Sequence, residues 1–84
     1  MQLSICAVHD SAAGAYARPF FVPTTALAHR SFSDEVNRAA PDNPMHAHAS
    51  DFTLFELGTF DDNSGTFTIT DPAVIARAKD LIKE

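Results

Sequence analysis

Two histidines stand two residues apart in the segment His46-Ala47-His48. In an extended chain, side chains at this spacing project to the same side, and such a pair can bind zinc or copper. Two ligands do not complete a tetrahedral site, and neither Cys6 nor His9 has a recognisable metal-ligand spacing relative to them. We therefore predict no metal ion and no other cofactor.

Hydrolytic chemistry needs a nucleophile beside a base, and the chain offers two such groupings. They are Ser11 with His9 and Asp10, and Cys6 with His9. No strained nucleophile turn surrounds Ser11. Cys6 lies within an expected strand, where a small buried thiol is the ordinary explanation. The three glycines are scattered, so no glycine-rich phosphate loop is formed. We predict no catalytic residue and no enzymatic activity.

The segment from Asp61 to Gly65 reads Asp-Asp-Asn-Ser-Gly and faintly resembles a calcium loop. It lacks the terminal bidentate glutamate and the flanking helices of such a loop. Asp, Asn and Gly are also common turn residues, and the segment lies between two expected strands. We predict a turn here.

Aromatic and basic residues occur together between positions 16 and 38. The rings near Arg18 could stack on unpaired bases while the guanidinium group contacts phosphate. The same rings could instead belong to the core, and the overall negative charge repels phosphate. The candidate nucleic-acid-binding residues are Tyr16, Arg18, Phe20, Phe21, Arg30 and Arg38.

The 84 residues are enough for one domain, which we place at 1–84. Eleven acidic residues against six basic ones give a net charge of −5, which argues against binding duplex DNA by charge alone. Cys6 is the single cysteine, so no intrachain disulfide is expected and the chain suits a reducing interior. We predict no membrane contact, because no apolar run approaches about 20 residues, and no signal peptide.

The first half of the chain reads as strand, extended segment and helix. A strand is expected over 2–8, and an edge strand or extended loop over 16–22, since prolines flank this second segment. A helix capped by Thr24 or Thr25 would present Ala28, Phe32 and Val36 on one face and continue to residue 39 or 40. From 41 to 50 we expect an exposed loop.

In the second half, the segment 51–60 gives the strongest strand signal. A return strand over 66–70 would form a hairpin with it. Asp71 and Pro72 have the residue types that begin a helix, and apolar residues at helical spacing follow as far as Ile82. The predicted fold class is α+β, with a small, mainly antiparallel sheet of three or four strands and two helices in the order β-β-α-β-β-α.

The strand over 51–60 carries apolar residues on both faces. Phe52, Leu54 and Phe60 share one parity, and Phe55 and Leu57 share the other. A strand of this kind needs cover on both sides. A domain of this size has little material for the second side, so we predict a homo-oligomer, either a dimer or larger, or a complex with a partner protein.

Several stretches together resemble the small nonstructural protein of gokushovirus-type microviruses, which are phages with circular single-stranded DNA. The most specific stretch is Phe-Thr-Leu-Phe-Glu-Leu-Gly followed by Phe-Asp-Asp. The segments that carry the resemblance are His9–Ser11, Ala13, Ala15, Tyr16, Pro19–Phe21, Ala28, Phe32–Asp34, Val36, Asn37, His48, Asp51–Gly58, Phe60–Asp62 and Gly65. Ala49-Ser50 departs from the family, which usually has a proline and an acidic residue there, and the C-terminal segment has no match.

The resemblance implies a nonstructural phage protein that acts in the host bacterial cytoplasm and supports synthesis of the single-stranded genome. It supplies no catalytic residue. Our leading hypothesis is weak binding of single-stranded DNA by an oligomer, where avidity offsets the low positive charge. The alternative is a protein-interaction module that docks on a phage or host replication protein, or on an assembly protein, without contacting DNA.

Overall fold

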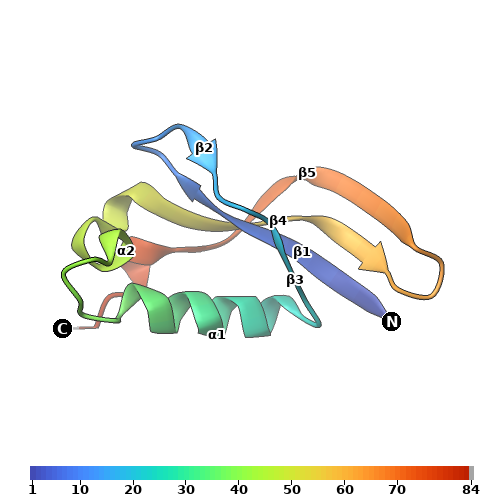
Figure 1. Ribbon diagram of the computed structural model, residues 1–84, viewed down its shortest axis with the longest axis horizontal. Coiled ribbons are helices and arrows are strands. Elements are labelled where there is room, and N and C mark those ends of the chain that lie inside the picture. Colours follow the sequence, from blue (N-terminus) through green and yellow to red (C-terminus); the bar gives the residue numbers. More distant parts are fainter. Residues whose placement is uncertain (84) are drawn as a thin grey trace.

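Five strands form one antiparallel sheet in the computed structural model, which describes residues 1–83 (Figure 1). The strands are β1 (Gln2–Asp10), β2 (Ala15–Tyr16), β3 (Phe20–Val22), β4 (Phe52–Asp61) and β5 (Thr66–Arg77). The order across the sheet is β2-β1-β4-β5, and β3 also pairs with β1. The helices are α1 (Thr25–Val36) and α2 (Pro44–Ala47), and short 3-10 turns span Ala49–Asp51 and Ala78–Asp80. The predicted α+β class is confirmed, with five strands in the sheet.

Helix α1 forms the second layer of the molecule along one side of the sheet (Figure 1). The Thr24 hydroxyl caps the helix by accepting a hydrogen bond from the backbone N–H of Leu27 at 3.3 Å. The expected stripe of Ala28, Phe32 and Val36 is buried against Cys6, Val8, Phe52 and Leu54 of the sheet. This packing is the core of the domain, and the predicted helical face is confirmed.

The predicted end of the helix at residue 39 or 40 is wrong, because α1 ends at Val36. The Asn37 side chain donates hydrogen bonds to the carbonyl oxygens of Ser33, at 2.8 Å, and Leu81, at 2.9 Å. Asn37 also accepts a bond from the backbone N–H of Lys83. A side chain that bonds the preceding turn and a distant segment competes with continuation of the helix.

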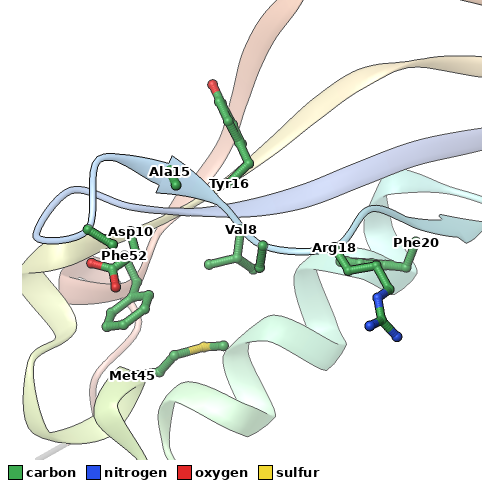
Figure 2. Close-up of a pocket in the computed structure, with 10 residues that line it drawn as sticks. Val8, Asp10, Ala15, Tyr16, Arg18, Phe20, Met45 and Phe52 are labelled. Carbon is green, nitrogen blue, oxygen red and sulfur yellow. The ribbon is translucent and has the colours of Figure 1, made fainter.

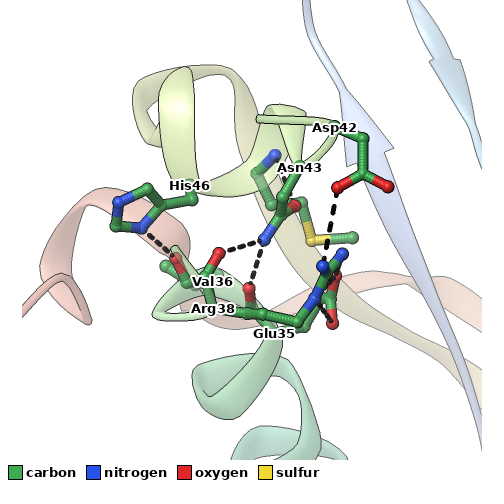
Figure 3. A network of polar contacts seen from close by, with 7 residues as sticks. Glu35, Val36, Arg38, Asp42, Asn43 and His46 are labelled. Carbon is green, nitrogen blue, oxygen red and sulfur yellow. Dashed lines mark hydrogen bonds and ion pairs between the residues drawn. The ribbon is translucent and has the colours of Figure 1, made fainter. Parts of the chain in front are cut away.

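The loop predicted over 41–50 is wrong, because this segment forms α2 and the start of a 3-10 turn and folds back onto the end of α1, although six of its ten residues are exposed as expected. Asn43 is only 2% exposed. Its side-chain amide donates to the carbonyl oxygens of Glu35, at 2.7 Å, and Arg38, at 2.9 Å, and its Oδ1 caps α2 at Met45 (Figure 3). One buried amide therefore holds the segment in place, and Met45 packs against the core.

The predicted C-terminal helix is also wrong, because β5 continues to Arg77 and is followed by a single 3-10 turn. Ile69 pairs with Gly58 and Ala73 pairs with Glu56, so the residues 70–72 form a bulge opposite Leu57. Pro72 is tolerated there because it lies in a bulge of an edge strand. The structure does contain a second helix, but it is the short α2, which precedes β4 in the chain.

Gly58 of β4 faces the backbone of Thr68 and Ile69 in β5 with no room for a side chain. Its φ is 154°, and a Cβ atom at this position would overlap the Thr68 carbonyl oxygen. We expect Gly58→Ala to lower the free energy of unfolding by about 3 kcal/mol, because strain and overpacking combine. Urea denaturation measures this loss.

Gly65→Ala is the control for this substitution. Gly65 has a φ of 70°, and a Cβ there would meet open space, so only the conformational penalty of about 1 kcal/mol applies. Equal losses for the two variants would contradict the close approach of the strands at Gly58.

Candidate nucleic-acid interface

The register of the sheet assigns its side chains to two faces. Directly paired residues of an antiparallel sheet project to the same side, and α1 covers the side that carries Cys6, Val8 and Leu54. We call the opposite side the helix-free face. Its four rows are Leu3-Phe60-Phe67, Ile5-Gly58-Ile69, Ala7-Phe55-Val74 and His9-Thr53-Arg77, with Phe21 beside Ile5 and Tyr16 beside His9.

Two aromatic clusters lie on the helix-free face. In the first, ring centroids are 4.7 Å apart for His9 and Tyr16 and 5.5 Å apart for Tyr16 and Phe55. The second contains Phe21, Phe60 and Phe67, with centroids 4.8 Å apart for Phe60 and Phe67 and 5.7 Å apart for Phe21 and Phe60. Edge and tilted contacts of this kind stabilise aromatic pairs by about 0.5–1.5 kcal/mol beyond their burial.

These clusters remain open to solvent despite their mutual contacts. Tyr16 is 43% exposed, Phe21 49% and Phe67 55%. The aliphatic residues beside them, Ile69 and Val74, are also exposed. The exposed area of these five side chains is on the order of 400–500 Å² in total, divided between the surroundings of the two clusters.

Charge is distributed unequally between the two sides of the sheet. The carboxylates at paired positions, Asp10, Glu56 and Asp61, all project to the side of α1. The Ser4 hydroxyl donates a 2.6 Å hydrogen bond to Glu56 there. Among the paired positions of the helix-free face, the basic side chains are His9 and Arg77, and none is Asp or Glu. None of these three strand carboxylates therefore lies on the helix-free face.

The sequence profile described as Phage ORF5 protein matches residues 3–81, nearly the whole chain. The chain belongs to the Phage ORF5 protein family. It is thus a small phage protein, which agrees with the resemblance to a phage family. No curated protein and no solved structure gives a significant match. No helix within residues 1–83 has the length and apolar character needed to cross a membrane.

The six residues predicted to bind nucleic acid do not form one surface in this family member. Tyr16 and Phe21 lie on the helix-free face, whereas Phe20 packs against the core on the other side. Arg18 is exposed beside β2, and Arg30 is exposed on α1.

Arg38 already has acidic partners. Its guanidinium group lies 2.7 Å from a Glu35 carboxylate oxygen and 3.6 Å from Asp42 (Figure 3). The hydrogen bond from Arg38 holds the pKa of the Glu35 carboxyl below its usual value. This pairing reduces what Arg38 can offer to a phosphate group.

Five residues of the helix-free face were not among the predicted nucleic-acid-binding residues, namely His9, Phe55, Phe60, Phe67 and Arg77. Phe67 and Ile69 alternate with threonines, a pattern that does indicate one common face. The sequence did not place Arg77 on this face, because its segment was predicted to be a helix.

A separate pocket of about 370 Å³ opens on the side of α1 and is lined by residues of β1, β2, β3, β4 and α2. Val8, Met45 and Phe52 contribute to its apolar wall, and Asp10 and Arg18 also line it (Figure 2). The ring of Tyr16 points away from it (Figure 2). The aromatic residues predicted to stack on bases therefore lie on both sides of the sheet, with Phe20 at this pocket and Tyr16 and Phe21 on the helix-free face.

The other groups singled out in the sequence occupy ordinary structural positions. His46 makes a 3.0 Å hydrogen bond through Nδ1 to the Val36 carbonyl oxygen, while His48 is exposed. Asp61 accepts a bond from the backbone N–H of Asn63 and stabilises the predicted turn. In the part of the chain that the structure describes, no three potential metal ligands of the His, Cys, Asp and Glu types come together.

Cys6 is fully buried against α1, and His9 projects to the opposite face, so the two side chains do not meet. Burial raises the pKa of the Cys6 thiol, although a hydrogen bond with Ser4 partly opposes this rise. The thiolate, which is the reactive form, is therefore scarce at neutral pH.

We expect iodoacetamide to modify Cys6 at least 100-fold more slowly in the native protein than in urea, because the thiol is both buried and protonated. Rapid alkylation of the native protein would contradict this burial.

The raised pKa of Cys6 also predicts a pH dependence of the free energy of unfolding. It adds stability below the unfolded pKa of about 8.5, and this contribution disappears as the pH rises through the folded value. Cys6→Ala should therefore lose less stability than the unaltered protein in this alkaline range, as measured by urea denaturation.

Proposed function

We propose that this phage accessory protein is a nonstructural protein of a gokushovirus-type microvirus, acting in the host cytoplasm. It supports synthesis of the single-stranded viral genome by binding single-stranded DNA weakly on its helix-free face. The observation that carries this proposal is a solvent-exposed aromatic sheet face that has no carboxylate at its paired positions.

Unpaired bases stack on exposed aromatic rings whatever their sequence, with about 1–3 kcal/mol per base. Tyr16, Phe21 and Phe67 each present roughly half of their surface for such stacking. Two separate clusters allow successive bases to use different parts of the same face. The proposal therefore favours binding with little base preference.

The basic groups available on this face are few. Arg77 and His9 lie in one row with Thr53. Electrostatic attraction to phosphate is correspondingly small, and the net charge of −5 opposes it. Binding should therefore be weak and only slightly dependent on salt, since few phosphate contacts form, which agrees with the predicted dependence on avidity. Arg30 lies on α1, behind the sheet, and we assign it no DNA contact.

A second candidate function is docking on a phage or host replication protein, or on an assembly protein, without DNA. The exposure of aliphatic Ile69, at 68%, and of Val74 favours it, because aliphatic side chains contribute less than rings to base stacking. Pull-down from infected cells separates the two functions. A partner retained after nuclease treatment and lost with Ile69→Ser supports docking.

Fluorescence anisotropy with a labelled oligonucleotide of about 20 nucleotides at low salt tests the DNA proposal. Tyr16→Ala and Phe21→Ala should each weaken binding about 5- to 100-fold, because each removes a stacking surface. Arg77→Gln should weaken binding and also reduce its dependence on salt.

Arg30→Gln provides the matched control, since it removes the same charge from the opposite side of the molecule. It should bind like the unaltered protein. Circular dichroism confirms that each variant is folded. Absence of binding, or an equal loss with Arg30→Gln and Arg77→Gln, would refute the assignment to the helix-free face.

A further inference from the structure

The two edges of the sheet are protected to different degrees. One edge of β1 carries two short strands, β2 and β3, and prolines 19 and 23 flank β3 closely. Short strands and prolines are common means of preventing edge-to-edge pairing. At the opposite edge, β5 is twelve residues long and, within residues 1–83, pairs with β4 on one side only.

The first half of β5 lacks protective features. Its sequence over 66–70 is Thr-Phe-Thr-Ile-Thr, which contains no charge, no proline and no glycine, and all five residues are exposed. Asp71 and Pro72 are confined to the bulge that follows. Residues 66–70 thus form a free edge of β-branched and aromatic residues, the composition that favours strand pairing.

This segment is complementary to itself. If two copies pair antiparallel about a twofold axis at Thr68, Thr66 lies opposite Thr70, and Phe67 lies opposite Ile69. Every directly opposed pair is then uncharged, although each chain carries a net charge of −5. Phe67 and Ile69 share the helix-free face, so each pair is apolar and covers part of the exposed surface of Ile69.

We propose that residues 66–70 of β5 pair with the same residues of a second copy of this chain. Because the twofold axis is perpendicular to the sheet, the helix-free faces of both copies point to the same side. The two five-stranded sheets then become one continuous sheet, and Phe67 of each copy lies near the junction.

The dimer is weak. Pairing over five residues buries less than the roughly 1,000 Å² that a stable interface usually requires. Self-association therefore falls in the micromolar range or weaker. The pairing does not require nucleic acid, so its success or failure is independent of the DNA proposal.

Sedimentation equilibrium of the DNA-free protein from about 5 to 500 μM tests the proposal, and the average mass should rise toward that of a dimer. Thr68→Lys and Thr68→Glu should each weaken dimerisation at least tenfold, because each places two like charges opposite one another at the twofold axis. Ala73→Lys, which adds the same charge to β5 beyond the bulge, should dimerise normally.

The decisive sample is an equimolar mixture of Thr68→Lys and Thr68→Glu. Opposite charges then meet at the axis, so a heterodimer should form as tightly as the original dimer or more tightly. Its recovery also shows that both variants are folded. A monomer throughout the concentration range, normal dimerisation of either single variant, or no recovery on mixing would overturn the proposed pairing.

Discussion

The structure depends on the packing of one short helix against a longer sheet. Twelve residues of α1 extend about 18 Å, whereas the molecule is 42 Å long. Phe32, Val36 and Leu54 are buried in one core cluster, which seals one side of the sheet. The β4–β5 hairpin extends beyond the helix (Figure 1), and the reverse side has no second layer within residues 1–83. The exposed aromatic surface follows from this shortage of covering material.

Sequence patterns predicted those elements whose side-chain periodicity matches their surroundings. The helix stripe, the first strand and the strand apolar on both sides were all recognised, and with them the α+β class. The C-terminal segment was wrongly predicted to be a helix, because Asp71-Pro72 and the spacing of the apolar residues after them are typical of a helix start and a helix face. Pairing with β4 outweighs these local preferences, and the bulge at 70–72 accommodates the proline. Likewise, the role of Asn43 depends on the carbonyl oxygens of Glu35, in α1, and of Arg38, just after the helix, and the sequence alone does not show these contacts.

The candidate interface was only partly predictable for a similar reason. Phe20 and Phe21 are adjacent, so in a strand they must point to opposite sides, but the sequence does not say which side is buried. Pairing with β1 decides this, placing Phe20 on the core side and Phe21 on the open side. The partners of Phe21, Phe60 and Phe67, are distant in the chain and join it only through strand register.

The paired positions of the strands separate carboxylates from exposed rings across the thickness of the sheet. Asp10, Glu56 and Asp61 project on one side, and Arg77 projects on the other. Repulsion between these three carboxylates and an approaching polyanion is therefore weakest over the rings. A polyanion that reaches the sheet from the side opposite α1 meets aromatic side chains before it meets any of these three strand carboxylates.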